Sequence, residues 1–318
     1  MASAPDISFV IPVYNKADVL PAVVRALATQ RPAPQAEYIF VDDASTDGSA
    51  ALLKQLSPQL PGMTVLANDG NAGPSIRLNQ GAAQAAGRYL CLIDADELIA
   101  PDAVSVMLRL MRDNNAQMVH GKIERAEQPA ATLVPSPIGN MPPHVVLDTP
   151  LADILAGRGF VRMSWLVETA LFRAAGGCDP RIFIQDESLP LRLAAVARRM
   201  IDLQAPTGYA PFAASRLSAN KAQQHHDRFC AAYNLLRDRP DLPADTRNAL
   251  RRRCLSAAWK ATRVGLLDSD RLGLLLGYVA AKAGLPAMSD PALDRVAAAF
   301  ASLDGIRRIP ASPEKAIA

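Results

Sequence analysis

The sequence lacks the glycine-rich loops that mark the common nucleotide-binding folds. No G-x-G-x-x-G follows the first apolar segment, and no G-x-x-x-x-G-K-[ST] occurs in the 318 residues. The first motif is typical of dinucleotide-binding domains, and the second is typical of P-loop enzymes. Nicotinamide cofactors and P-loop nucleotide hydrolysis are therefore disfavoured.

Paired cysteines, an excess of one charge and long apolar runs are also missing. The four cysteines lie far apart, without the spacing of a zinc or redox site, so we expect free thiols in a reducing compartment. A net charge of +3 from 34 basic and 31 acidic residues does not favour a nucleic-acid-binding protein. No apolar run is long enough to span a bilayer and no secretory signal begins the chain, so we predict a cytoplasmic location, either free or peripheral at the cytoplasmic face of the membrane.

Alternating apolar and amphipathic segments predict the fold. The apolar, β-branched segments ISFVIPVY, AEYIFVDD, MTVLAND and YLCLIDAD are each followed by helical spacing, which indicates an α/β fold with a mostly parallel central sheet. Beyond residue 206 the composition shifts to Ala, Leu and Arg with helical spacing. We therefore expect one domain over residues 1–205 and a helical C-terminal region over residues 206–318, with 126–150 as a surface excursion.

Carboxylates gather where the predicted strands end. The second and fourth segments end in Asp42, Asp43, Asp94, Asp96 and Glu97. Because the carboxyl ends of parallel strands share one edge of a sheet, these acids should form an acidic rim. Such a rim repels a diphosphate unless a cation lies between them, and carboxylates beside phosphate oxygens are suited to Mg²⁺ or Mn²⁺. Taken alone, DADE is equally well explained by acids that precede a helix beginning near Pro101.

Four blocks in this order resemble the family 2 glycosyltransferases with the GT-A fold. They are ISFVIPVYN, IFVDDASTDGS, NAGPSIRLNQGAAQAAGRYLCLIDADE and GGCDPRIFIQDESLPLRLA, and the resemblance covers about residues 6–200. It implies an inverting, metal-assisted transferase that moves a sugar from a nucleotide diphosphate donor to an acceptor hydroxyl, in polysaccharide or glycoconjugate synthesis. The implied cofactor is a divalent metal, Mn²⁺ or Mg²⁺.

The resemblance also assigns roles to individual residues. Those implied to bind the nucleotide sugar are Pro12, Tyr14, Asp43, Arg77 and Asp94. Asp96 is implied to coordinate the metal through the diphosphate. For Asp42, a ligand role and a role in the following turn both stay open.

The block IQDESLPLR supplies a carboxylate for the acceptor hydroxyl. Aligned on the family pattern, the general base falls on Asp186, although Gln185 stands where the family more often has Glu and an acid follows at Glu187. Glu187 therefore stays open as an alternative base. The same acids suit the start of a helix over SLPLRLAAVARR, with Pro190 expected in its first turn.

Two further residues are candidates for the site. Trp165 is expected to be half-buried or to line the acceptor pocket, because an aromatic face suits a sugar ring. His225, beside His226, lies where some relatives offer a further metal ligand.

Other functions are less consistent with the sequence. A phosphatase of the D-x-D type would carry its motif after the first strand, whereas here the motif follows the fourth. A non-catalytic scaffold should have lost Asp96 or the base, and this chain keeps both. The acceptor, whether a glycan, a lipid-linked saccharide or another hydroxyl compound, is not encoded in a readable motif. For the C-terminal region, an acceptor lid, a contact between copies of the chain and a peripheral membrane contact all stay open.

Overall fold

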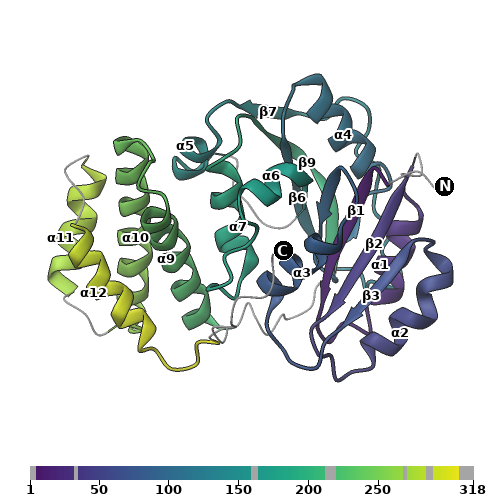
Figure 1. Ribbon diagram of the computed structural model, residues 1–318, viewed down its shortest axis with the longest axis horizontal. Coiled ribbons are helices and arrows are strands. Elements are labelled where there is room, and N and C mark those ends of the chain that lie inside the picture. Colours follow the sequence, from purple (N-terminus) through teal and green to yellow (C-terminus); the bar gives the residue numbers. More distant parts are fainter. Residues whose placement is uncertain are drawn as a thin grey trace.

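The computed structural model has a sheet at one end and a bundle of helices at the other (Figure 1). It describes residues 5–31, 35–158, 164–211, 220–267, 271–283 and 289–307. Strands and helices alternate through the first part of the chain as the sequence predicts. In order they are β1 (Ile7–Val13), α1 (Leu20–Ala28), β2 (Ala36–Asp42), α2 (Ser49–Leu56), the 3₁₀ turn Ser57–Gln59, β3 (Met63–Ala67), α3 (Pro74–Gln84) and β4 (Tyr89–Leu92).

The central sheet has the order β3-β2-β1-β4-β8-β6-β9-β5, with β7 added beside β9. The remaining strands are β5 (Leu98–Ile99), β6 (Met118–Ala126), β7 (His144–Leu147), β8 (Trp165–Glu168) and β9 (Met200–Pro211). The first four strands pair in parallel, and β8 then runs antiparallel to both β4 and β6. In the sheet, β2 and β3 lie on one side of β1 and β4 lies on the other, so the strand order reverses at β1. Ligands bind at such a reversal in open α/β sheets. The predicted α/β fold is confirmed.

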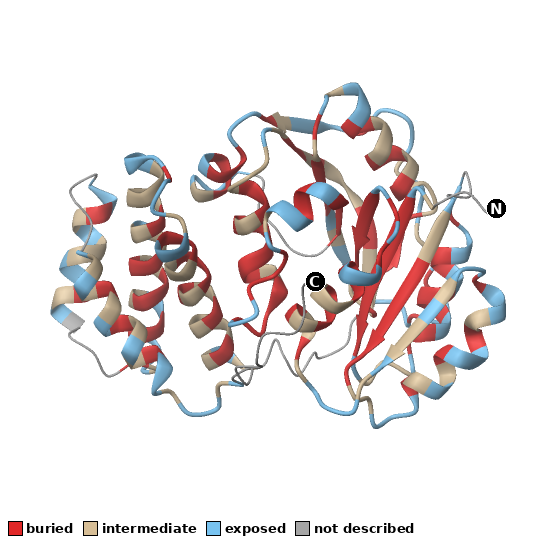
Figure 2. Cartoon of the chain, viewed as in Figure 1, coloured by how far each residue is buried: buried red, intermediate tan, exposed pale blue. Residues whose placement is uncertain are grey.

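Both faces of the sheet are buried, which explains why the strands read as continuous apolar runs (Figure 2). In β1, Phe9 and Ile11 belong to the core under α1 and α4 (Ala103–Asp113), whereas Val10 belongs to the opposite core under α3 and α7 (Gln185–Ala194). This second core continues without a break into the helical part of the molecule. The sheet edge that carries the acids is therefore fixed by packing on both sides.

The C-terminal helices form a layered bundle beside the second core (Figure 1). The helices after β4 are α4 (Ala103–Asp113), α5 (Pro150–Leu155), α6 (Thr169–Ala174), α7 (Gln185–Ala194), α9 (Lys221–Asp238), α10 (Ala244–Arg263), α11 (Arg271–Lys282) and α12 (Asp290–Ala301). Asp290 ties α12 to α10 through Arg251 Nε at 2.9 Å. The predicted boundary at residue 205 falls inside β9, and the first helix of the bundle among the described residues begins at Lys221.

Two local predictions differ from the structure. Pro190 does not lie in the first turn of its helix: α7 begins at Gln185, so Pro190 is an interior residue. The expected surface excursion over 126–150 contains a strand, β7, which pairs with β9 and places Leu147 in the core. Among the described residues, no helix combines the length and apolarity that crossing a membrane requires.

Candidate active site

The acids that follow β4 meet a lysine that follows β1. Asp96 forms an ion pair with Lys16, and both side chains are about one-third exposed at 30% and 28%. Since β1 and β4 are parallel neighbours, their carboxyl ends bring these residues together from 80 positions apart. Lys16 was not predicted as a site residue; its position directly after Tyr14 and Asn15 at a strand end was the available signal.

Asp94 and Glu97 lie deeper in the same cluster. Burial raises the pKa of Asp94 well above its ordinary value, and the nearby charges of Asp186 and Asp96 raise it further. Burial likewise raises the pKa of Glu97, again with contributions from Asp94 and Asp96. Lys16 is the cation that acts on Asp94 in this group, so the cluster has more carboxylates than positive charge. Such a cluster favours the entry of a cation.

Asp186 comes to this cluster on the first turn of α7. Its neighbour Gln185 is buried and donates from Nε2 to Asp94 Oδ1 at 3.0 Å. The Gln185 side chain can donate to a carboxylate, whereas a glutamate there would add a further negative charge. The departure from the usual family pattern is thus accommodated by a hydrogen bond that joins the D-x-D segment to the helix carrying Asp186.

Glu187 has different surroundings from Asp186. Its carboxylate accepts from Arg228 Nη2 of α9 at 2.8 Å, and the residue is 7% exposed. The positive charges of Arg228 and Arg253 also lie near it. The two consecutive acids therefore have different neighbours: the charge of Asp186 acts on Asp94, whereas Glu187 forms an ion pair with Arg228 of α9.

Asp43 and Arg77 form a buried ion pair at the end of β2. Asp43 Oδ1 accepts from Arg77 Nε at 2.7 Å and from the Ala72 N–H at 2.7 Å, while Oδ2 accepts from the Gly73 N–H at 2.8 Å. Gly73 has a positive φ of 91° and lies so close to the Phe183 ring that a Cβ would clash with it. Asp43 thereby fixes the loop between β3 and α3.

The other residues expected to bind the nucleotide lie at the same edge. Asp42 is 2% exposed; its Oδ2 accepts from the Ser45 N–H at 3.1 Å, and its Oδ1 has no hydrogen-bond partner among the residues described. Pro12 lies within β1 opposite Val41, whereas Tyr14 is 40% exposed just beyond the strand. Tyr14 thus offers an accessible aromatic ring at the edge, and Asp42 serves the following turn.

Two candidate residues have surroundings that do not suit their expected roles. Trp165 is 0% exposed in β8 and packs against His120 with ring centroids 4.8 Å apart, so it neither is half-buried nor lines an open pocket. The expectation rested on the residue type, because an aromatic face suits a sugar ring, whereas the structure places Trp165 in an inner strand between β4 and β6. His225 lies among the positive charges of Lys221, Arg228 and Lys260, and these charges disfavour a bound cation beside it.

The donor set for a metal consists of carboxylates from one segment. Oxygen ligands suit Mg²⁺ and Mn²⁺, and Mg²⁺ is commonly held by one or two carboxylates together with substrate phosphates. Within the described parts of the chain, no group of three His, Cys, Asp or Glu side chains could hold a metal ion. Asp94 and Asp96 therefore fit a metal that takes its remaining ligands from a diphosphate and water.

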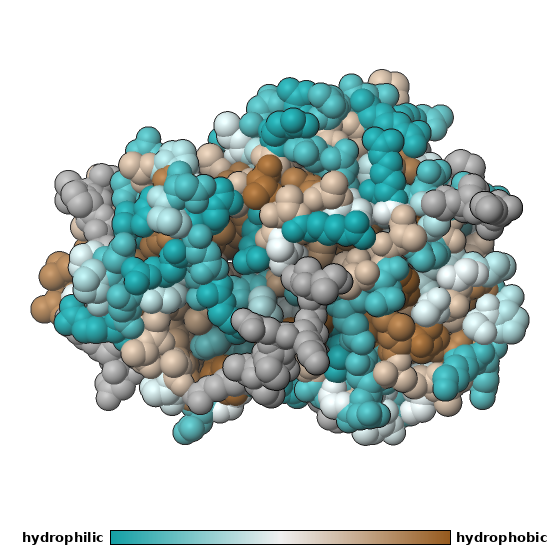
Figure 3. Space-filling model, in the orientation of Figure 1, coloured by the Kyte–Doolittle hydropathy of each residue, from teal (hydrophilic) through white to brown (hydrophobic). Residues whose placement is uncertain are grey.

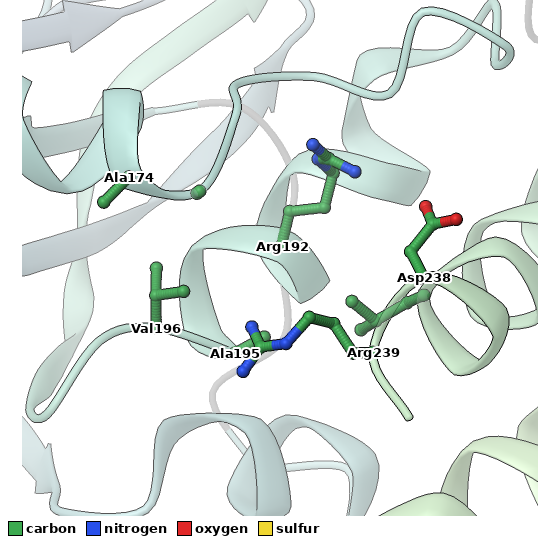
Figure 4. A pocket seen from close by; sticks show the side chains of 8 residues that line it. Ala174, Arg192, Ala195, Val196, Asp238 and Arg239 are labelled. Carbon is green, nitrogen blue, oxygen red and sulfur yellow. The ribbon is translucent and has the colours of Figure 1, made fainter. Parts of the chain in front are cut away.

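A hollow elsewhere on α7 is separate from this cluster. It is lined by residues of α6, α7 and α9, including Arg192, Asp238 and Arg239 (Figure 4). Arg192 lies six residues beyond Asp186, about 9 Å along the helix at 1.5 Å per residue. This hollow therefore opens near the far end of α7 from the acidic cluster.

Comparisons with known proteins agree with this geometry. The model for Glycosyl transferase family 2 matches residues 8–157. The succinoglycan biosynthesis protein ExoO of Rhizobium meliloti is 31% identical over 114 residues, covering 36% of this chain and 32% of ExoO. A poly(ribitol-phosphate) beta-glucosyltransferase of Bacillus spizizenii is 32% identical over 120 residues, covering 37% of this chain and 19% of that protein. The matches thus span about a third or less of these relatives.

Solved structures extend the likeness in fold over most of the chain. The structure of S. aureus TarS in complex with UDP-GlcNAc superposes with a TM-score of 0.68 at 17% sequence identity. The match covers 92% of this chain and 88% of the TarS chain. The mannosyltransferase PcManGT from Pyrobaculum calidifontis, in complex with GDP-Man and Mn²⁺, has a TM-score of 0.55 at 17% identity, covering 94% and 85%. Residues 8–157 thus match glycosyltransferase family 2, and the chain as a whole has the GT-A fold.

Proposed function

We propose that the protein is an inverting glycosyltransferase that moves a sugar from a nucleotide diphosphate donor to an acceptor hydroxyl. The observation that carries this proposal is the hydrogen bond between Gln185 and Asp94, because it brings the predicted base beside the predicted donor site. Asp94 and Gln185 are 91 positions apart in the sequence, yet they meet at the sheet edge where the strand order reverses. A transferase needs its donor site and its base close together, and this contact supports that arrangement.

In the proposed reaction, Asp186 accepts the proton of the acceptor hydroxyl. The acceptor oxygen forms a bond to the anomeric carbon while the bond from that carbon to the diphosphate oxygen breaks, so the configuration inverts. Asp186 suits this role because it is ionisable, lies at the start of α7 and is close enough to Asp94 for its charge to act on that carboxyl group. When bound by Asp96 and Asp94, a divalent metal, Mn²⁺ or Mg²⁺, neutralises charge on the departing diphosphate.

The donor side is assigned to the edge formed by β1, β2 and α3. Asp43 and Arg77 hold the loop 70–73, and we assign the nucleotide base to the surface between this loop and the ring of Tyr14. Pro12 shapes this surface from within β1. The complexes of TarS with UDP-GlcNAc and of PcManGT with GDP-Man and Mn²⁺ support a nucleotide sugar as donor and a divalent metal as cofactor.

The acceptor is proposed to be a glycan or glycoconjugate. ExoO is named for succinoglycan biosynthesis and the Bacillus relative for glucosylation of poly(ribitol phosphate), which supports a role in polysaccharide synthesis. The helical region beyond residue 206 is assigned to the acceptor side, since α9 contacts the helix that carries Asp186 through Arg228. The free thiols Cys91, Cys178, Cys230 and Cys254 support a reducing compartment such as the cytoplasm.

The test is a donor screen with purified protein. Nucleotide sugars are incubated with Mn²⁺ and a panel of glycan and lipid-linked acceptors, and release of nucleoside diphosphate and the configuration of the new linkage are measured. Inverted product that disappears in Asp186→Asn supports the proposal. Retained configuration, or full turnover in Asp186→Asn, contradicts it, and metal-dependent nucleotide binding without turnover on any acceptor would favour the non-catalytic scaffold.

A further inference from the structure

Helix α11 exposes a continuous apolar stripe. Leu272, Leu275, Leu276 and Val279 follow the spacing i, i+3, i+4, i+7 and are 66%, 36%, 59% and 54% exposed. Val264, just after α10, adds a fifth apolar side chain at 62%. Five of the nine large apolar residues that are exposed in the described chain therefore lie between positions 264 and 279.

The opposite face of α11 is packed in the ordinary way. Leu274 and Ala281 are 2% and 4% exposed, and the Tyr278 ring stacks on Trp259 of α10 with centroids 6.4 Å apart. The helix is thus anchored on one side and apolar on the other. Figure 3 shows brown surface at the left edge of the molecule, where Figure 1 places α11, at the end away from the sheet.

Exposed basic residues lie on the same two helices as this stripe. Arg252, Lys260 and Arg263 of α10 and Lys282 of α11 are exposed. Arg251 of α10 is instead paired with Asp290, and Arg253 is largely buried near Glu187. Arg252 and Lys282 line a hollow between the two helices together with Tyr278. At about 100° per residue, Lys282 lies about 20° from Leu275 around α11, so this cation borders the stripe directly.

We infer that α11 docks on the surface of an anionic lipid bilayer, with its apolar stripe among the acyl chains nearest the head groups and the exposed side chains of Arg252, Arg263 and Lys282 against lipid phosphates. One apolar stripe or one basic patch alone gives only weak and reversible attachment, whereas the two together are the usual requirement for stable peripheral binding. The structure combines both on adjacent surfaces. The inference goes beyond the proposed transferase activity and does not depend on the donor or acceptor.

A second copy of the chain fits this surface less well. A 12-residue helix is about 18 Å long and about 10 Å wide, so its stripe offers about 180 Å², whereas stable interfaces bury about 800 Å² on each partner. Two copies would also bring two basic surfaces together, and like charges oppose such an interface. An anionic bilayer complements both the charge and the shape.

The test is co-sedimentation of the full chain with phosphatidylcholine vesicles that either contain or lack phosphatidylglycerol. The stripe variant is Leu272→Ser with Leu276→Ser, and the charge variant is Arg252→Gln with Lys282→Gln. A matched control is Val134→Ser with Met141→Ser, because these residues are 83% and 94% exposed far from α11 in the sequence. All changed side chains are exposed or line an open hollow, so folding should be kept; circular dichroism and binding of a nucleoside diphosphate with Mn²⁺ are measured in parallel.

We expect wild type and control to sediment with the anionic vesicles, less so as salt rises, and the stripe and charge variants to lose about tenfold or more in partitioning. Equal partitioning of the stripe variant and wild type would overturn the inference. So would a wild-type dimer that dissociates in the stripe variant without any binding to vesicles. Loss of vesicle binding with nucleotide binding intact separates this result from a failure of the proposed function.

Discussion

Asp227 of α9 accepts the backbone N–H of Ile184 at 2.8 Å, two residues before the predicted base Asp186. Asp227 is fully buried, and its other oxygen accepts from Gln223 Nε2 at 2.9 Å and lies 2.7 Å from His226 Nδ1. The first backbone donors of a helix have no partner within the helix, so a side chain from a neighbouring helix is needed here. The helical region therefore holds the start of α7 in place.

Replacement of Asp227 by Asn should misplace the base without affecting the donor side. The amide cannot serve three donors as the carboxylate does, so we expect about 1–3 kcal/mol of lost stability and a lower kcat. Nucleoside diphosphate affinity should stay unchanged, because the donor edge is built by β1, β2 and α3. Thermal unfolding, steady-state kinetics and calorimetry measure the three quantities. The control is Asp241→Asn, a 61% exposed side chain beyond the same helix, which should alter none of them.

The adjacent acids of α7 should respond differently to removal of their charge. Asp186→Asn should lower kcat by about 10³-fold or more, because general base catalysis typically contributes 10²–10⁴-fold and the amide cannot accept the proton. Glu187→Gln should keep turnover within about tenfold of wild type but weaken the contact with Arg228, with a cost of about 1–3 kcal/mol in stability. Turnover assays and chemical unfolding distinguish the two variants. The reverse pattern would move the base to Glu187.

Stability should depend on pH through Asp94. Because its pKa is raised in the folded protein, the folded state keeps a proton that the unfolded chain releases near its ordinary value of 3.8. Stability is therefore lost as pH rises through the folded pKa. Asp94→Asn removes this loss, so the variant should be more stable than wild type at pH 8 and nearly equal to it at pH 4.

Metal binding should stabilise wild type more than Asp94→Asn, which is the reverse of the order expected without metal at pH 8. Mn²⁺ with a nucleoside diphosphate should raise the unfolding temperature of wild type at pH 8 and leave Asp94→Asn little changed. Unfolding scans at both pH values, with and without the two ligands, provide the comparison. A stability difference that is independent of pH would contradict the raised pKa of Asp94.

Lys16 should compete with metal for Asp96. The ammonium occupies the same carboxylate that a divalent ion would take, so Lys16→Met should raise the affinity for Mn²⁺ in the absence of nucleotide by about tenfold. Electron paramagnetic resonance counts free Mn²⁺ directly and needs no turnover. Lys16→Arg, which keeps the charge, should bind Mn²⁺ as wild type does; equal affinity in Lys16→Met and wild type would remove Lys16 from the site.

The fold was predictable because the strands and helices of the first hundred residues have distinct spacings and alternate regularly. The positions of Asp43, Asp94 and Asp96 followed from their places at strand ends. Contacts across the chain could not be predicted in this way. Nothing in the sequence indicates that Gln185 donates to Asp94 or that Glu187 pairs with Arg228, because α7 and α9 reach the site through packing in the second core.

Two errors have the same physical origin. Trp165 was assigned from its residue type, because an aromatic face suits a sugar ring, but its burial is set by β4 and β6 on either side of β8. Pro190 was placed in a first turn because proline is favoured there, yet α7 begins five residues earlier at Gln185. In both cases the pairing or packing of distant segments outweighed a local preference.

The most direct test of the central claim is a calorimetric titration with nucleoside diphosphates, each with and without Mn²⁺, in wild type and Asp96→Ala. The account predicts that one nucleotide binds in a Mn²⁺-dependent manner and that Asp96→Ala loses the dependence on metal while remaining folded. Binding of the same nucleotide that is equally strong without metal, or unchanged in Asp96→Ala, would contradict it.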